Sequence, residues 1–329
     1  MKVLILHPSS RYDRYLPDIP AAGRMELVFT DREGPEERWL AAGGDAEALV
    51  AAPVTPVTEE LIARMPHLKL IHSDGVGYDR IDLAAARERG IYVCNNKGCN
   101  AGAVAEQTVL LILMLLRHAL EGDEAVRAGR QMEMKERCMV EGITELSACK
   151  VGLVGFGDIA RAAAERLVPF GCELYYYTKH RRLPEEEKKY HVTYLPLEEL
   201  AEKSDIVSLH CAVTEETRNL VDAALLRRMK PTAYLINTAR GDLVDNEALR
   251  QALLEGRIAG AGLDTLSPEP VPAGHPLTAL PPEVHRKVVL APHLGGITEA
   301  SFRRAHAHMW RNVEHLAAGE LPDNIVNGL

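Results

Sequence analysis

The sequence lacks the features of a secreted, membrane-spanning or metal-binding chain. Its longest apolar run, residues 109–116, is about half the length that a bilayer span requires, so it predicts a buried helix. Residues 1–7 are too short an apolar run for a signal peptide and predict a first β-strand. The six cysteines form no CxxC pair, which favours reduced thiols and a cytoplasmic location. His306 and His308 are too close together to share a helical face, so we expect no metal site.

Positive charge is also in short supply. The chain has 38 lysines and arginines against 47 acidic residues, a formal net charge of −9. This balance argues against a nucleic-acid or anionic-membrane partner, since either would need a net basic face. With 47% hydrophobic and 26% charged residues, the 329-residue chain has the composition of a globular protein long enough for two domains.

Short β-branched runs alternate with helical patterns along the whole chain. This alternation is typical of an α/β fold with mostly parallel sheets and helices on both faces. Asn100 can cap a helix over residues 101–120 that is apolar enough to be buried on several sides. A last helix over residues 298–317 should pack back on the first domain, because no strand follows it. The predicted strands are residues 3–7, 49–52, 68–73, 91–94, 151–154, 174–177, 206–210, 233–237, 258–264 and 288–291.

A glycine-rich turn joins the strand at 151–154 to a helical pattern that begins at Ile159. Gly155 permits a tight turn, Gly157 lets the backbone approach a pyrophosphate, and Ala160 is small enough for the helix to lie against the strand. This geometry aims the N-terminal amides of a helix at a dinucleotide. Residues 155–159 therefore predict a dinucleotide-binding Rossmann turn, which also includes Phe156 and Asp158.

Three side chains that could carry chemistry follow late strands. Arg240 comes after the strand at 233–237, Glu269 after 258–264 and His293 directly after 288–291. The carboxyl ends of strands in an open doubly wound sheet face the ligand crevice, so these three side chains should gather beside the bound cofactor. Prolines at 268, 270 and 292 restrict the backbone next to two of them.

These motifs resemble those of the D-isomer-specific 2-hydroxyacid dehydrogenases. The matching segments, in the order of that family, are residues 75–79, 100–106, the nucleotide turn, 236–241, 261–270 and 292–296. The resemblance implies two doubly wound parallel-sheet domains, with a Rossmann nucleotide domain (100–293) inserted into a flavodoxin-like substrate domain (1–99 plus 294–329).

The resemblance also implies roles for individual residues. His293 would be the general acid and base, with Glu269 on its other ring nitrogen favouring the imidazolium. Arg240 and the amides of Val76 and Gly77 would hold the substrate carboxylate. Asp264 would contact the nicotinamide end of the cofactor. Further cofactor-binding positions implied are Thr108, Cys211, Thr238, Ala239, Gly295 and Gly296.

The second nucleotide-domain strand ends without the acid that NAD-preferring relatives place there. Thr178 occupies that position, and Lys179 and Arg181 follow it. A hydroxyl beside cations attracts a 2′-phosphate, which predicts that NADP(H) is preferred and that NAD(H) is possible. Asp158 stands where many relatives have arginine, so backbone amides would have to hold the pyrophosphate.

The expected activity is NAD(P)H-dependent reduction of a small 2-oxo acid, of the glyoxylate or hydroxypyruvate type, to the D-2-hydroxy acid. The enzyme is expected to be a homodimer, because the region of the helix over residues 101–120 joins two nucleotide domains in relatives. D-3-phosphoglycerate dehydrogenase, phosphite dehydrogenase and a nucleotide-sensing, corepressor-like binding protein are the alternatives. Glu269 disfavours formate dehydrogenase, which uses a non-ionisable amide at that position.

Overall fold

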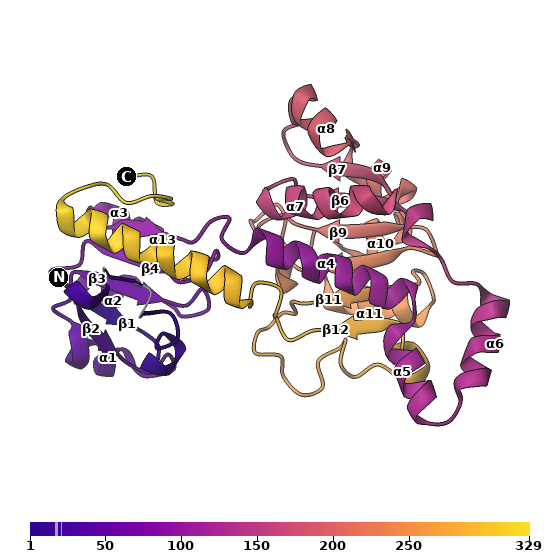
Figure 1. The fold of residues 1–329 in the computed structure, drawn as a ribbon, viewed down its shortest axis with the longest axis horizontal. Coiled ribbons are helices and arrows are strands. Elements are labelled where there is room, and N and C mark those ends of the chain that lie inside the picture. Colours follow the sequence, from indigo (N-terminus) through magenta and orange to yellow (C-terminus); the bar gives the residue numbers. More distant parts are fainter. Residues whose placement is uncertain (17–18, 21) are drawn as a thin grey trace. The chain divides into compact units, whose positions relative to one another are not determined.

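The computed structural model describes residues 1–16, 19–20 and 22–329. The chain divides into two compact units, one made of Met1–Asn100 with Ile297–Leu329 and the other of Ala101–Gly296. Figure 1 shows that each unit is a sheet with helices packed against it. Both sheets are entirely parallel, and the α/β fold predicted from the sequence is confirmed.

The first unit has the strand order β2-β1-β3-β4-β5, which is the flavodoxin-like order. Strands β3 and β4 are buried at every position, as expected where both faces of a parallel sheet are covered. Trp39 of α1 packs on one face, and Trp310 of α13 packs on the other. The elements are β1 (Lys2–Ile5), β2 (Glu26–Phe29), β3 (Ala48–Ala51), β4 (Leu70–Ser73), β5 (Tyr92–Cys94), α1 (Glu36–Gly43), α2 (Glu59–Ala63), α3 (Leu83–Glu88), α13 (Glu299–Ala318), and the 3-10 turns η1 (Ser9–Arg11) and η3 (Ala22–Arg24).

The second unit has the strand order β12-β11-β10-β9-β6-β7-β8. This is the Rossmann order, and the direction of winding reverses between β6 and β9, where such sheets bind their ligands. Helices α4 and α7 cover one face of the sheet, and α9, α10 and α11 cover the other. The strands are β6 (Lys150–Val154), β7 (Glu173–Tyr177), β8 (Val192–Tyr194), β9 (Ile206–Leu209), β10 (Tyr234–Asn237), β11 (Gly260–Leu263) and β12 (Val288–Leu290). The helices and 3-10 turns are α4 (Ala101–Leu116), α5 (Ala119–Arg127), α6 (Gln131–Glu141), η4 (Leu146–Ala148), α7 (Asp158–Leu167), η5 (Val168–Phe170), α8 (Pro184–Tyr190), α9 (Leu197–Lys203), α10 (Ala223–Arg228), η6 (Gly241–Leu243), α11 (Asn246–Leu254) and α12 (Pro282–His285).

The structure differs from the sequence-based prediction at two edge strands and one helix. Strands β2 and β8 were not predicted; both are short strands at sheet edges, with a weaker apolar signal than central strands. The single helix predicted over 101–120 is wrong, because α4 ends at Leu116 and α5 starts at Ala119. Between them His118 has a left-handed backbone (φ 48°), which breaks the helix.

No single described helix is long and apolar enough to cross a membrane. Helices α4 and α5 meet that criterion only as a pair, across a 57° bend.

Candidate active site

The turn after β6 has the backbone that a dinucleotide site needs. Gly155 has a φ of +94°, and a Cβ there would lie 2.7 Å from the backbone nitrogen of Cys211. Only glycine fits this position. Gly157 precedes α7, and a Cβ on it would meet nothing within 4 Å, so the N-terminus of the helix is open to an anion. The Phe156 side chain is buried against Tyr176, which leaves only its backbone for a cofactor.

The basic residues after β7 are held by carboxylates and by the nucleotide turn. Lys179 Nζ lies 2.8 Å from Glu216, and Arg181 makes two bonds of 2.8 and 2.9 Å to Glu187. Arg182, which was not among the predicted cofactor residues, donates from Nη2 to the carbonyl of Phe156 at 3.1 Å. It therefore joins the basic segment directly to the turn after β6.

Thr178, the first residue after β7, uses its hydroxyl within its own loop. Its Oγ1 donates to the carbonyl of His180 at 2.6 Å. No acidic side chain occupies this position at the strand end, so no carboxylate there opposes an anion on the adenosine ribose.

Glu269 and His293 are in direct contact. Nδ1 of His293 lies 2.9 Å from each carboxylate oxygen of Glu269, and both side chains are more than one third exposed. Because Nδ1 faces the carboxylate, Nε2 is the ring nitrogen left to face a ligand. His293 has a left-handed backbone (φ 56°), which sets the direction in which its ring leaves the strand end.

Asp264, at the end of β11, fixes the loop that carries His293. Its Oδ1 accepts the Leu294 N–H at 2.9 Å, and its Oδ2 accepts the Gly295 N–H at 2.8 Å. Its backbone carbonyl accepts the N–H of His293 at 2.8 Å. Gln107 of α4 donates a further bond to Oδ1 at 3.3 Å. Asp264 is thus buried and bonded to three donors that fix this loop, and its contact with the cofactor stays a prediction.

Arg240 lies in the loop after β10, next to the loop that carries Glu269. A Cβ on the adjacent Gly241 would be only 2.1 Å from the backbone carbon of Leu266, so the two loops touch. Ser267 Oγ also donates to Asp242 at 2.8 Å. The Arg240 Nη1 donates to the carbonyl of Ala239 at 2.8 Å. Since β10, β11 and β12 are neighbouring parallel strands, all three predicted catalytic residues lie on adjoining loops at the carboxyl ends of these strands.

Two of the predicted cofactor positions are internal threonines. Thr108 of α4 is fully buried, and its hydroxyl lies 2.9 Å from that of Thr238 after β10. Thr108 also bonds to the carbonyl of Val104 at 2.9 Å. Burial raises the pKa of Cys211, another predicted cofactor position, to about 11, so its thiol is neutral.

In the first unit, the loop after β4 turns its carbonyls toward the protein. Ser73 Oγ donates to the carbonyl of Gly77 at 2.6 Å, and Asn95 Nδ2 donates to that of Val76 at 2.6 Å. Within the described part of the chain, the N–H groups of Val76 and Gly77 have no hydrogen-bond acceptor. The loop therefore offers two backbone donors, the pattern that suits a carboxylate.

Comparison with known proteins gives matches over most of the chain. Residues 109–295 match the family model described as the D-isomer specific 2-hydroxyacid dehydrogenase, NAD binding domain. The chain is 42% identical over 303 residues to the glyoxylate reductase of Thermofilum pendens, covering 92% of this chain and 88% of that one. It is 40% identical over 283 residues to the glyoxylate reductase of Korarchaeum cryptofilum, covering 86% and 83%. The D-lactate dehydrogenase of Aquifex aeolicus, solved with NAD and lactic acid, has a TM-score of 0.83 and 28% identity over the whole of both chains.

These matches agree with the structure of the second unit. The strand order and the glycine turn after β6 suit a dinucleotide, and the matched residues 109–295 span both. The resemblance drawn from the sequence motifs is confirmed. The chain is an oxidoreductase with an NAD-binding domain, and it belongs to the D-isomer-specific 2-hydroxyacid dehydrogenase family.

Proposed function

We propose that the protein reduces a small 2-oxo acid of the glyoxylate or hydroxypyruvate type to the D-2-hydroxy acid. The observation that carries this proposal is the contact between His293 and Glu269, which lies at the carboxyl ends of the strands in a dinucleotide-binding unit. Relatives named glyoxylate reductase, at 42% and 40% identity, support the substrate class.

The proposed chemistry assigns one task to each side chain. The bound nicotinamide supplies the hydride. His293 donates the Nε2 proton to the carbonyl oxygen, while Glu269 holds Nδ1 and stabilises the imidazolium before transfer. Arg240, with its permanent charge, binds the substrate carboxylate and polarises the carbonyl. In the first unit, the N–H groups of Val76 and Gly77 are also suited to a carboxylate.

A panel of 2-oxo acids assayed with NADPH and with NADH tests this function. We expect turnover with glyoxylate or hydroxypyruvate, and its loss in His293→Ala with dinucleotide binding retained. His285→Ala, a change at the exposed end of α12 in the same unit, is the matched control and should remain active. Exclusive activity on phosphite or 3-phosphoglycerate, or dinucleotide binding without turnover of any acid, would contradict the proposal.

We further propose that NADP(H) is the preferred cofactor. The strand end after β7 has the Thr178 hydroxyl in place of a carboxylate, and Lys179, Arg181 and Arg182 follow it. Lys179 is 69% exposed and paired with Glu216, so solvent and this carboxylate screen its charge, and we expect a modest preference for NADP(H).

The test of cofactor preference is the ratio of kcat/KM for NADPH to that for NADH. Lys179→Gln should lower the ratio, because it removes one cation beside the strand end after β7. Lys203→Gln is the matched control, because Lys203 is also exposed and paired with one glutamate but lies at the end of α9. A wild-type enzyme that uses NADH as well as or better than NADPH would overturn this preference.

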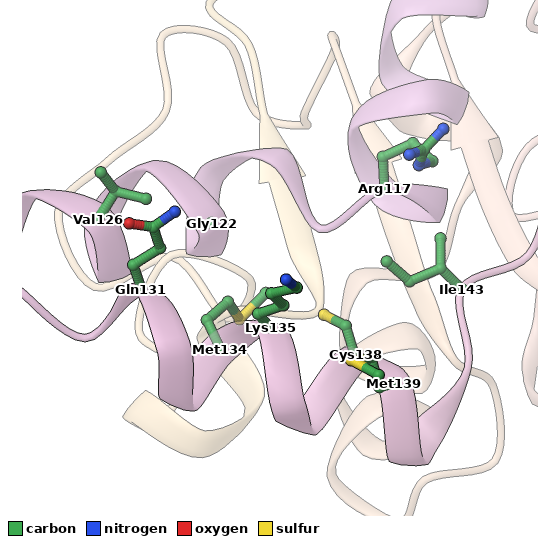
Figure 2. Close-up of a pocket in the computed structure, with 9 residues that line it drawn as sticks. All are labelled: Arg117, Gly122, Val126, Gln131, Met134, Lys135, Cys138, Met139 and Ile143. Carbon is green, nitrogen blue, oxygen red and sulfur yellow. The ribbon is translucent and has the colours of Figure 1, made fainter.

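We also propose that the enzyme is a homodimer joined through the arm formed by α5 and α6. Helix α6 has no buried residue, although an isolated helix of 11 residues is marginal in water. An open pocket of about 500 Å³ lies in this arm. Figure 2 shows that its lining includes apolar side chains such as Met134, Met139 and Ile143, together with the charged side chains of Arg117 and Lys135. Met139 and Val140 are 74% and 87% exposed. A second copy would bury this surface.

Molar mass in solution tests the dimer. The wild-type chain should sediment as a dimer, and the double variant Met139→Glu with Val140→Glu should sediment as a monomer. Leu183→Glu changes an equally exposed apolar residue away from the arm and should leave the dimer intact. A monomeric wild type, or a dimer that survives the double variant, would contradict the proposed interface.

A further inference from the structure

Arg182 differs from the other cations after β7 in where its side chain lies. The side chains of Lys179 and Arg181 are mostly exposed and pair with glutamates. Arg182 is half-buried, and its Nε is enclosed by the protein. Its Nη2 donates to the carbonyl of Phe156, between the two glycines of the turn after β6, at 3.1 Å. The guanidinium of Arg182 is therefore directed at a backbone group of the nucleotide turn.

Two tyrosines hold Arg182 and Phe156 in place. The hydroxyl oxygen of Tyr176, in β7, accepts the backbone N–H of Arg182 at 2.9 Å, and the same hydroxyl donates to Glu187 at 2.7 Å. The ring of Tyr176 packs on the ring of Phe156, with centroids 4.7 Å apart. On another side the Phe156 ring meets Tyr190 edge-on, with centroids 5.6 Å apart. Both ends of the bond between Arg182 and the turn are thus fixed.

The bond from Arg182 sets the direction of one N–H group of the turn. The peptide group between Phe156 and Gly157 is trans, and in a planar trans peptide the C=O and the N–H point in opposite directions. Because the carbonyl faces Arg182, the Gly157 N–H faces away from it. Among the described residues this N–H has no acceptor and, chain neighbours aside, none comes within 4 Å of a Cβ built on Gly157. A donor of this kind, at the start of a helix, suits a phosphate oxygen.

The direction of this N–H matters because the next side chain cannot bind a phosphate. Asp158 follows Gly157, and a carboxylate has no donor to offer, so backbone N–H groups must hold a pyrophosphate here. We propose that Arg182 is a positioning residue, whose bond to the Phe156 carbonyl directs the Gly157 N–H toward the pyrophosphate of the dinucleotide. NADH and NADPH share the pyrophosphate, so Arg182 supports the binding of both. This inference rests on the turn after β6 as the dinucleotide site of the proposed reductase.

Equilibrium titration of the full-length enzyme with NADH and with NADPH tests this role. Arg182→Met keeps the apolar stem but removes the donor, and it should raise the Kd for both dinucleotides by roughly tenfold, because a hydrogen bond from a charged group is lost. The kcat at saturating cofactor should change by less than about threefold, since the reacting groups are untouched. Arg182→Lys keeps a cationic donor and should recover part of the affinity for both dinucleotides.

Tyr176→Phe is a second test, which holds even if Arg182→Met folds poorly. It removes the hydroxyl that holds the Arg182 backbone but keeps the ring on Phe156, so it should raise the Kd for both dinucleotides by a smaller factor. Lys188→Met is the matched control, because Lys188 is an exposed cation of the neighbouring helix α8. It should leave both Kd values unchanged.

Four results would overturn the positioning role while leaving the proposed function intact. A rise in Kd confined to NADPH would show that Arg182 contacts the 2′-phosphate. Unchanged affinities in Arg182→Met, or a loss that Arg182→Lys does not recover, would show that the bond to Phe156 does not direct the turn. A fall in kcat at saturating cofactor as large as the rise in Kd would show a general distortion of the unit. A wild type that binds neither dinucleotide would overturn both this inference and the proposed function.

Discussion

Replacing Asp264 by asparagine tests whether this carboxylate holds the loop that carries His293 in its active position. The carboxylate accepts the N–H groups of Leu294 and Gly295 at 2.9 and 2.8 Å, one on each oxygen. An asparagine side chain has one acceptor oxygen, so its NH₂ group would face one of these N–H donors. A hydrogen bond to a charged group contributes about 1.5–3 kcal/mol. Losing one of them should lower the free energy that holds the loop in its anchored position by about 2 kcal/mol. If only the anchored loop is active, this corresponds to roughly a 30-fold loss of rate.

The assay separates loop placement from cofactor contact. We expect kcat for 2-oxo acid reduction to fall by roughly 30-fold in Asp264→Asn, with dinucleotide affinity, followed by fluorescence titration, changed by less than about threefold. In a His293→Gln background the same change should have little further effect, because the residue that the loop positions is already absent. Asp222→Asn is the control, since Asp222 caps α10 and asparagine caps a helix equally well.

Two results would refute this reasoning. An unchanged kcat with weakened dinucleotide binding would show that the carboxylate serves the cofactor and not the loop. Fully additive losses in the double variant with His293→Gln would show that Asp264 acts independently of the general acid.

Three further predictions concern Glu269, Gly155 and His72. Glu269→Gln should lower kcat/KM for oxo-acid reduction, because an amide does not hold Nδ1 of His293 as the carboxylate does; steady-state kinetics check this. Gly155→Ala should abolish dinucleotide binding and lower Tm, since the added Cβ would lie 2.7 Å from backbone atoms, and both are measured by titration and thermal melting. Burial lowers the pKa of His72 to about 4, so below about pH 6.5 the unfolded chain binds a proton that the folded chain does not. The free energy of unfolding should therefore fall by about 3 kcal/mol as the pH falls from about 6.5 to about 4. Urea melts at about pH 7 and pH 4.5 should show a smaller change in His72→Asn than in wild type.

Local patterns in the sequence were sufficient to predict the nucleotide turn and the strand ends that carry Arg240, Glu269 and His293. Each of these features is a strand followed within a few residues by a glycine or a functional side chain. Such local patterns can be recognised in a single sequence. The edge strands β2 and β8 were missed because their residues are only partly buried, which weakens the apolar pattern.

The contacts that the sequence could not reveal join residues far apart in the chain. Gln107 reaches Asp264 across 157 positions, and Arg11 reaches Asp74 across more than 60. Neither pair has a local spacing that identifies it. Arg182 was visible as one of several consecutive basic residues, but only the structure distinguishes it by its bond to the nucleotide turn.

Proton donation by His293 is the central step of the proposed reaction, and single-turnover reduction of a 2-oxo acid by His293→Gln measures it most directly. With the variant first saturated with NADPH, the rate of cofactor oxidation should fall by roughly 10²–10⁴ relative to wild type, while the affinity for NADPH stays within about threefold. Oxidation at the wild-type rate by the fully loaded variant would contradict the assignment of His293 as the acid.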